Sequence, residues 1–391
     1  MYQNSDEPAV SSSMFPAEKT IAEILAKRES KGALRKLFIT NKGVDFCSND
    51  YLGFARSPVL FSMVEERMKE LKVNNGSGGS RLLAGNSKYA EELEASLANT
   101  HAAPSALLFN SGYDANVGLF SSIALRGDTI LYDELVHASI HDGIRLSRAT
   151  SFPFRHNDMT HLEERLHKAK GNVFVVAESI YSMDGDAAPL ENIVELCDKF
   201  IAHCIVDEAH ATGVFGLGKV QEMGLQDKVY ARIHTFGKAM GCHGAIVSGS
   251  ETLKQYLINY ARSFIYTTSL PLHSLVSIEC AYKLLEKSSE EVKKLHANIK
   301  YFKSMNFFRS KIKNENKWID SQSAIQSLII PGNEKVKKLA LAIQEHNMDV
   351  RPIMSPTVAK GKERIRVCLH AYNTIDELDI LLNVLGKKLD K

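Results

Sequence analysis

The sequence has few of the features that mark metal-binding, disulfide-stabilised or membrane proteins. Its six cysteines are scattered, and no two have the C-x-x-C spacing of a zinc ribbon or the pattern of a disulfide framework. No apolar run approaches the ~18 residues that a membrane span requires. The polar, early-acidic first residues lack the basic-then-apolar order of a secretory signal. We therefore expect a cytoplasmic protein with a frayed N-terminus and no membrane contact.

An excess of one charge sign is also missing. The 48 Lys and Arg residues are balanced by 46 Asp and Glu residues, so the formal net charge is only +2. A chain of this kind has no broad field that attracts nucleic acid or an anionic membrane. We expect neither as a partner, although one local anion site remains possible.

The composition does support a large buried core. Of the 391 residues, 44% are hydrophobic and 24% are charged, which is typical of a globular chain with more than one structural unit. From about residue 88, helix-length segments alternate with continuous apolar segments of strand length. Such strands indicate a sheet covered by helices on both faces, and hence a mostly parallel α/β sheet. The predicted helices are 87–100, 115–123, 137–147 and 190–200, and the predicted strands are 105–109, 129–132, 172–178 and 203–207.

The pattern changes near residue 275. A long helix is predicted over 275–295, followed by strands at 323–330 and 365–369 and helices at 334–345 and 374–385. This succession predicts a smaller α+β C-terminal domain. Before the sheet region, a charged helical segment covers 17–37 and a short strand covers 45–49. We predict an N-terminal helical segment (1–48), a large domain (49–275) and a small domain (276–391).

Lys238 and Asp207 are candidates for pyridoxal phosphate (PLP) chemistry. Lys238 lies between small residues in HTFGKAMG (234–241), and Asp207 closes an apolar run 31 positions upstream. A PLP enzyme needs a lysine amine to hold the cofactor aldehyde as a Schiff base, and a carboxylate against the pyridine nitrogen. Taken alone, a solvated surface lysine and a helix-capping aspartate are the alternative interpretation.

Other polar residues follow the predicted strands, where open α/β sheets bind ligands. The turn 110–116 opens a helix and is suited to presenting N–H groups to a phosphate. His137 has the place of a ring-stacking imidazole or of a helix cap, and Ser182 that of a donor to a phenolic oxygen or of a cap. His137 and His141 are four residues apart, but no third ligand has a recognisable spacing, so we expect no metal.

The string DEAH at 207–210 brings a competing interpretation, because it matches a helicase box. Residues 213–219 also resemble a phosphate-binding loop. However, Val220 occupies the place of the magnesium-binding Ser or Thr, and the loop follows the acidic box instead of preceding it. We therefore interpret Asp207 as the partner of a ring nitrogen and His210 as a residue beside a ring oxygen.

Nine ordered motifs make the chain resemble the α-oxoamine synthases, which are PLP enzymes of fold type I. The resemblance runs from about residue 34 to the C-terminus and implies the aspartate aminotransferase-like PLP-dependent transferase fold. The motifs are SNDYLGF (48–54), GSGGSR (76–81), FNSGYDAN (109–116), DELVHAS (133–139), ESIYSMDGD (178–186), VDEAHATGVFG (206–216), HTFGKAMG (234–241), FIYTTSLP (264–271) and RIRV (364–367).

The resemblance implies a role for each matching residue. Lys238 matches the Schiff-base lysine, Asp207 the partner of the ring nitrogen, and His137 the residue stacked on the ring. Ser182 and His210 match groups near the ring hydroxyl, and Asn49 a polar group on the substrate side. Arg366 matches the arginine that binds the amino-acid carboxylate, but Arg364 shares its strand face, so periodicity leaves both open. The residues matching the phosphate site are Gly112, Tyr113 and Thr235 of one chain, with Thr267 and Thr268 of a second subunit.

Within the family the motifs most resemble the 8-amino-7-oxononanoate synthases, which condense L-alanine with a pimeloyl thioester in biotin biosynthesis. The resemblance implies a homodimer with shared active sites, and a donor carried by CoA or by a carrier protein. Arg35 is a candidate for the distal pimelate carboxylate, or else an exposed helix arginine. Residues 81–83 and 242–243 depart from the pattern, which leaves the acyl chain open. The alternatives are 2-amino-3-ketobutyrate CoA ligase, serine palmitoyltransferase, or a PLP-fold partner subunit without activity.

Overall fold

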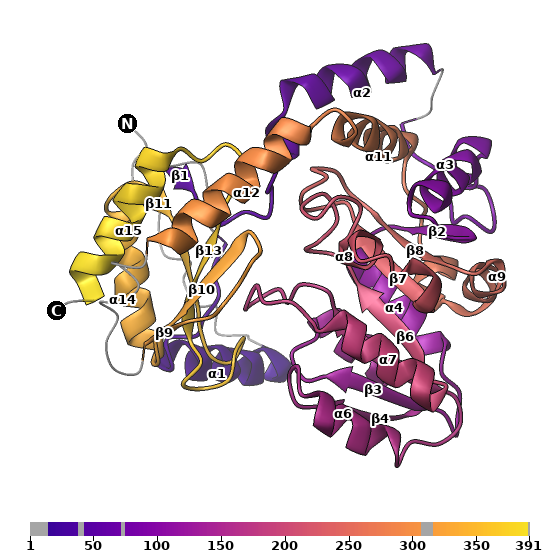
Figure 1. Cartoon of the computed structure of the whole chain (residues 1–391), viewed down its shortest axis with the longest axis horizontal. Coiled ribbons are helices and arrows are strands. Elements are labelled where there is room, and N and C mark those ends of the chain that lie inside the picture. Colours follow the sequence, from indigo (N-terminus) through magenta and orange to yellow (C-terminus); the bar gives the residue numbers. More distant parts are fainter. Residues whose placement is uncertain (1–14, 38–42, 72–74, 306–315, 390–391) are drawn as a thin grey trace.

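The computed structural model describes residues 15–37, 43–71, 75–305 and 316–389 (Figure 1). The first 14 residues, for which the sequence predicts fraying, lie outside this part of the chain. Among the described residues, no helix combines the length and the apolar character needed to cross a membrane.

The main sheet has seven strands in the order β2-β8-β7-β6-β5-β3-β4. Strand β8 is antiparallel to both of its neighbours, and the other neighbouring pairs are parallel. Because β8 opposes both β2 and β7, these two run in the same direction, and the carboxyl ends of six strands meet at one edge. The strands are β2 (Ser105–Phe109), β3 (Thr129–Asp133), β4 (Thr150–Phe154), β5 (Val173–Glu178), β6 (His203–Asp207), β7 (Ala231–Thr235) and β8 (Ala245–Gly249).

Helices cover both faces of this sheet, because successive strand residues are buried on opposite sides. Ile130 belongs to one apolar cluster and Leu131 to another, and Val176 and Val175 divide in the same way. The first cluster is closed by α4 (Gly112–Ser122), α5 (Ala138–Leu146) and α9 (Glu251–Tyr260), and the second by α6 (Met159–Leu166) and α7 (Leu190–Phe200). The remaining short helices of this region are α8 (Lys219–Glu222), η2 (Gln226–Lys228) and α10 (Arg262–Ile265).

A second sheet has four antiparallel strands in the order β12-β13-β10-β9. Figure 1 shows α14 and α15 on its outer side, and α12 above it. Its elements are β9 (Lys317–Trp318), β10 (Ile325–Ile329), β12 (Arg351–Ile353), β13 (Arg364–Cys368), α12 (Ser289–Ser304), α14 (Asn333–Gln344) and α15 (Ile375–Leu389).

The segment after residue 43 joins this second sheet region. Strand β1 (Val44–Asp45) pairs in parallel with β11 (Met348–Asp349). Further along, the Cys368 N–H donates to the Phe46 carbonyl at 2.9 Å, and the Ala371 N–H donates to the Tyr51 carbonyl at 2.8 Å. An early part of the chain is therefore held against the second sheet region.

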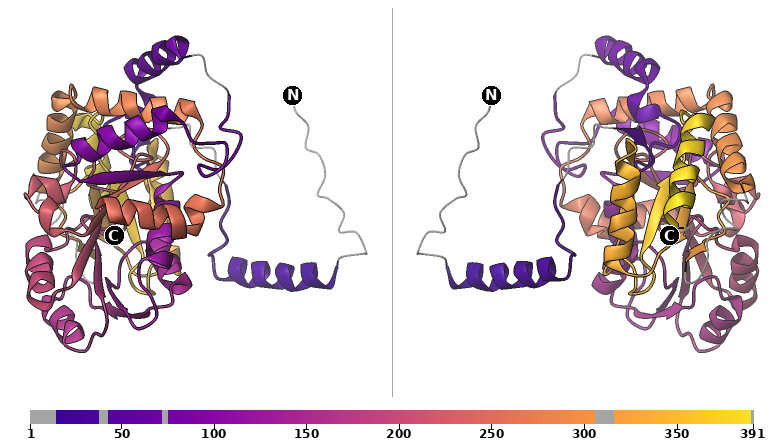
Figure 2. Two further views of the ribbon diagram at one scale, coloured as in Figure 1. Left: turned by 90° about the vertical axis from the view of Figure 1, so that its right-hand side faces the viewer. Right: turned by 90° about the vertical axis from the view of Figure 1, so that its left-hand side faces the viewer.

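The remaining helices precede or flank the sheets. Helices α2 (Pro58–Glu70) and α3 (Lys88–Thr100) pack against α11 (Leu272–Leu285), and η1 (Phe54–Arg56) precedes α2. Helix α1 (Pro16–Ser30) has no buried residue and stands away from the rest of the described chain (Figure 2).

The mostly parallel α/β sheet predicted from the sequence is confirmed, but some element bounds were wrong. The helix predicted over 275–295 is two helices, α11 and α12. In the break between them the buried Ser288 hydroxyl donates to the Leu284 carbonyl at 2.8 Å. The helix predicted over 17–37 ends at Ser30, shortly before Gly32 in the left-handed region (φ 62°). The strand predicted over 45–49 is reduced to β1. The division into domains at 48 and 275 stays a prediction.

Candidate active site

The carboxyl edge of the main sheet gathers most of the predicted site residues. Asp207 ends β6, and Thr235 ends β7 three residues before Lys238. His137 follows β3, Ser182 follows β5, and Gly112 begins the helix after β2. These strands run in one direction, so their ends place residues that are far apart in sequence at a single site.

Asp207 is buried and rigidly held. Its Oδ2 accepts a hydrogen bond from Asn116 Nδ2 at 2.8 Å, and its Oδ1 accepts one from the Ala209 N–H at 2.9 Å. Asn116 is itself fixed by its bond to Ser139 Oγ at 3.0 Å. A carboxylate in such a position can keep a neighbouring ring nitrogen protonated.

Lys238 lies within hydrogen-bonding distance of His210. The Lys238 Nζ is 2.8 Å from His210 Nε2. Burial lowers the pKa of Lys238 to about 8, although the carboxylates of Asp207 and Glu178 act in the opposite direction. Burial also holds the pKa of His210 well below its usual range, so this imidazole is neutral. A lysine with such a pKa is available as a neutral amine near physiological pH.

Glu178 is a site residue that the sequence reasoning did not single out. It ends β5 and is the register partner of Asp207 on β6. Burial raises its pKa to about 8, and the nearby Asp207 carboxylate adds to the rise. Its Oε2 accepts from the Ser182 N–H at 3.2 Å, while its Oε1 is buried without a partner among the described residues. The signal available in the sequence was its place, since Glu178 closes an apolar strand as Asp207 does.

The start of α4 forms an anion-binding turn. The side chain of Ser111 caps the Asp114 N–H at 3.1 Å. The N–H groups of Gly112 and Tyr113 have no intrahelical partner, because they begin the helix. A Cβ added to Gly112 would lie 3.2 Å from the Thr235 side chain. Glycine therefore lets this backbone approach Thr235 closely, as a phosphate cradle requires.

Thr267 and Thr268 lie beside the same turn. Asn110 Nδ2 donates to Thr267 Oγ1 at 3.0 Å and to the Thr268 carbonyl at 2.8 Å. Both hydrogen bonds lie within one chain, and Asn110, which donates them, directly precedes the capping residue Ser111. The role of these threonines toward a second subunit stays a prediction.

His137 is the N-cap residue of α5 and keeps an exposed ring. Its Nδ1 is 2.7 Å from Ser139 Oγ and 3.2 Å from the Ser139 N–H. The ring therefore caps the helix through one nitrogen, and its role as a ring-stacking residue stays a prediction.

The two arginines of β13 have different surroundings. Arg364 forms an ion pair with Asp184, and its Nε donates to the Lys362 carbonyl at 2.9 Å. Arg366 reaches the site, where its Nη2 donates to Asn49 Oδ1 at 3.0 Å and its Nε donates to the Ser182 carbonyl at 2.8 Å. Arg366 is therefore the arginine placed among the other candidate residues.

The turn that carries Ser182 is fastened to the second sheet along its length. The Met183 carbonyl accepts from Ser327 Oγ at 2.7 Å. The Gly185 carbonyl accepts from Ser321 Oγ at 2.7 Å and from Ser323 Oγ at 2.8 Å. Together with the pairs made by Arg364 and Arg366, these bonds attach a turn of the main sheet to its neighbour.

Tyr51 is a second residue that the sequence reasoning did not assign. It is buried, and its hydroxyl lies 2.8 Å from His210 Nδ1 and 3.1 Å from Asn49 Oδ1. The motif SNDYLGF contained it, but an aromatic residue after an Asn-Asp pair carries no signal of where its hydroxyl will lie. Arg35, by contrast, is exposed and bonds Thr357 Oγ1 at 3.2 Å.

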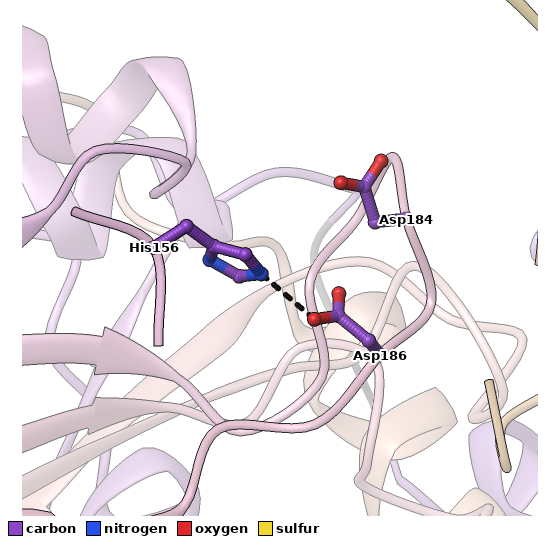
Figure 3. Close-up of side chains that lie close together, drawn as sticks. All are labelled: His156, Asp184 and Asp186. Atoms are coloured by element: carbon purple, nitrogen blue, oxygen red, sulfur yellow. Dashed lines mark hydrogen bonds and ion pairs between the residues drawn. The ribbon is translucent and has the colours of Figure 1, made fainter. Parts of the chain in front are cut away.

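One group among the described residues has the spacing of metal ligands, namely His156, Asp184 and Asp186 (Figure 3). The two ring nitrogens of His156 are already paired, with Asp133 Oδ1 at 2.9 Å and Asp186 Oδ2 at 2.7 Å. These carboxylates raise the pKa of His156 to about 9 against the opposing effect of burial. The group is thus an imidazolium between two carboxylates, and a protonated ring offers no lone pair to a metal.

The donors at the sheet edge fit PLP. At the start of α4, Gly112 brings backbone N–H groups that have no intrahelical partner close to Thr235. Asp207 supplies a fixed carboxylate, and Lys238 supplies an amine with a lowered pKa.

Comparisons with known proteins agree with this geometry. Residues 41–385 match the family Aminotransferase class I and II. An 8-amino-7-oxononanoate synthase of Emericella nidulans is 46% identical over 95% of this chain and 96% of its own. The structure of an 8-amino-7-oxononanoate synthase from Francisella tularensis is similar with a TM-score of 0.76 and 26% identity, covering 89% of this chain and 98% of that one.

A serine palmitoyltransferase from S. paucimobilis with bound PLP has a TM-score of 0.83 at 24% identity, covering 96% of this chain and 98% of its own, and shows the shared fold. The aspartate aminotransferase-like fold predicted from the sequence is thereby confirmed. The chain belongs to the class I and II aminotransferase family of PLP-dependent enzymes, in the α-oxoamine synthase group that contains the 8-amino-7-oxononanoate synthases.

Proposed function

We propose that this enzyme condenses L-alanine with a pimeloyl thioester to give 8-amino-7-oxononanoate, the free thiol and carbon dioxide. The observation that carries the proposal is the arrangement of Lys238, Asp207 and Arg366 around one sheet edge. The 46% identity to an 8-amino-7-oxononanoate synthase, which extends over 95% of this chain, favours alanine and pimelate among the family's substrates.

PLP, when bound, supplies an electron sink that stabilises negative charge on the α-carbon of an amino acid. Lys238 would attach it, and Asp207 would keep a positive charge on its ring nitrogen. The N–H groups of Gly112 and Tyr113, with the Thr235 hydroxyl, would bind its phosphate. His137 would face the ring, and Ser182 and His210 would hold the ring oxygen.

The remaining steps belong to the protein's own side chains. Arg366 binds the carboxylate of the amino acid through its guanidinium, and Asn49 orients that guanidinium by accepting from its Nη2. Lys238, with a pKa of about 8, is poised to take the α-proton and to return a proton later. Glu178, whose pKa is also about 8, can gain or lose a proton beside Asp207 near neutral pH.

Two features concern the acyl donor and the assembly. The exposed Arg35 guanidinium is available to a distal carboxylate, which only a dicarboxylic acyl chain possesses. We also propose a two-fold homodimer in the cytoplasm, in which Thr267 and Thr268 of one subunit approach the phosphate bound by its partner.

The test is a thiol-release screen of the purified enzyme with PLP. L-Alanine, glycine and L-serine are each combined with pimeloyl-CoA, acetyl-CoA and palmitoyl-CoA, and the product is identified by mass spectrometry. We expect turnover with alanine and pimeloyl-CoA, and none in Lys238→Ala, whereas Lys294→Ala on the exposed face of α12 keeps full activity. Turnover with serine and palmitoyl-CoA instead would assign the enzyme to the serine palmitoyltransferases.

A further inference from the structure

Four hydrogen bonds connect Arg366 on the second sheet with Lys238, which follows β7 of the main sheet. They pass through the side chains of Asn49, Tyr51 and His210, which come from the early segment and from the turn after β6. We call this row of side chains the relay. Its distances are 3.0 Å (Arg366 Nη2 to Asn49 Oδ1), 3.1 Å (Tyr51 Oη to Asn49 Oδ1), 2.8 Å (Tyr51 Oη to His210 Nδ1) and 2.8 Å (His210 Nε2 to Lys238 Nζ).

The chemistry of the groups sets the direction of each bond in the relay. A guanidinium only donates, so the Asn49 atom facing Arg366 is the amide oxygen. That oxygen only accepts, so Tyr51 must use its single proton to donate to it. The Tyr51 oxygen is then the acceptor for His210, and the proton of the neutral imidazole sits on Nδ1. His210 Nε2 therefore presents a lone pair to Lys238.

We propose that Tyr51 is a positioning residue that fixes His210 in the tautomer with its proton on Nδ1, so that Nε2 accepts a hydrogen bond from the Lys238 amine. In this arrangement His210 stabilises the protonated form of Lys238. The opposite tautomer would direct a proton at Lys238 and would stabilise only the neutral amine. Tyr51 thus strengthens Lys238 as a base without touching it.

Several charged groups face the same lysine and set the background for this effect. Asp207 on β6 and Glu178 on β5 favour its protonated form, whereas burial and the Arg366 guanidinium on β13 oppose it. His210 also faces Arg366 and His137. These groups remain in place when only the Tyr51 hydroxyl is removed, so their contributions cancel in a comparison with Tyr51→Phe.

The inference rests on the proposed function only in giving Lys238 its role as base. The tautomer can be measured in the full-length chain before and after addition of PLP, by long-range ¹⁵N–¹H correlation spectra of histidine-labelled protein. The His210 signal is assigned with His210→Asn. A second readout is the pKa of Lys238 before PLP is added, while its amine is free; it is taken from the pH dependence of competitive acetylation and read by peptide mass spectrometry.

Wild type is expected to show the Nδ1–H form. In Tyr51→Phe we expect the Nε2–H form or an exchanging mixture, and a fall of about one unit in the pKa of Lys238, as expected for loss of one charge-assisted hydrogen bond. The matched control is Tyr282→Phe, because the Tyr282 hydroxyl lies 2.6 Å from a different buried histidine, His101. This control should leave both readouts at His210 and Lys238 unchanged.

A second variant tests the same logic should Tyr51→Phe not fold. Asn49→Ala removes the acceptor that commits the Tyr51 proton, so Tyr51 becomes free to donate to His210, and the Nε2–H form should appear. An Nε2–H form in wild type, or an unchanged Nδ1–H form in the folded Tyr51 variant, would overturn the proposal. Failure to bind PLP or to turn over alanine would instead count against the proposed function, since the tautomer is read separately.

Discussion

The imidazolium of His156 should make the stability of this enzyme fall at alkaline pH. Its two nitrogens lie 2.9 Å from an Asp133 oxygen and 2.7 Å from an Asp186 oxygen, and these pairs raise its pKa from 6.5 to about 9. Because the folded-state pKa is the higher one, the stabilisation is complete below pH 6.5 and is lost as the pH rises through 9.

The size of the effect follows from the shift. At about 1.4 kcal/mol for each pKa unit, the shift corresponds to roughly 3 kcal/mol of unfolding free energy. Replacing His156 by glutamine leaves two carboxylates, those of Asp133 and Asp186, without their cation, so this variant should already be less stable at pH 6 by about 3 to 5 kcal/mol.

Urea unfolding of wild type and His156→Gln at pH 6, 7.5 and 9.5 measures both effects. We expect the gap between the two proteins to narrow by about 3 kcal/mol from the lowest to the highest pH. The exposed His346→Gln is the matched control and should follow wild type throughout. A constant gap would refute the reasoning, because it would mean that His156 is not charged in the folded enzyme.

Three further outcomes are expected. Arg366→Ala should raise KM for alanine by roughly 10- to 100-fold, as loss of a charged hydrogen bond predicts. Arg364→Ala should instead lower the thermal midpoint and leave KM for alanine close to wild type. Steady-state kinetics and melting curves distinguish the two variants. Gly112→Ala should weaken PLP binding about tenfold, because the added Cβ lies 3.2 Å from Thr235; equal affinity by absorbance titration would contradict the phosphate cradle. Burial lowers the pKa of His101 from 6.5 to about 3, so its stabilisation is present above pH 6.5 and lost as the pH falls, and calorimetry between pH 7 and 4 should show a smaller decline in His101→Gln than in wild type.

The sequence predicted those parts of the fold that depend on local pattern. Strands β2 and β6 and helix α7 have the predicted bounds. The two strands are short apolar runs, and the helix has apolar residues at helical spacing, so each period is clear from the sequence. The position of Lys238 and Asp207 at one edge follows from the rule for parallel strands, once their order is known.

The rest depends on contacts that sequence spacing does not encode. Strand β8 runs against its neighbours, although its short apolar run carries no signal of strand direction. Arg364 and Arg366 share a strand face, and they differ in their tertiary partners: Arg364 pairs with Asp184, whereas Arg366 donates to Asn49. Tyr51 reaches His210 across 159 positions of sequence, so its role required the tertiary structure.

The fastening of residues 182–185 has a consequence for motion. These residues follow β5, yet Arg364, Arg366 and the three serines at 321, 323 and 327 hold them to the second sheet. If the second sheet moves when an amino acid binds, Ser182 moves with Arg366. Binding of the amino-acid carboxylate by Arg366 and the contact of Ser182 at the ring oxygen would then form and break together.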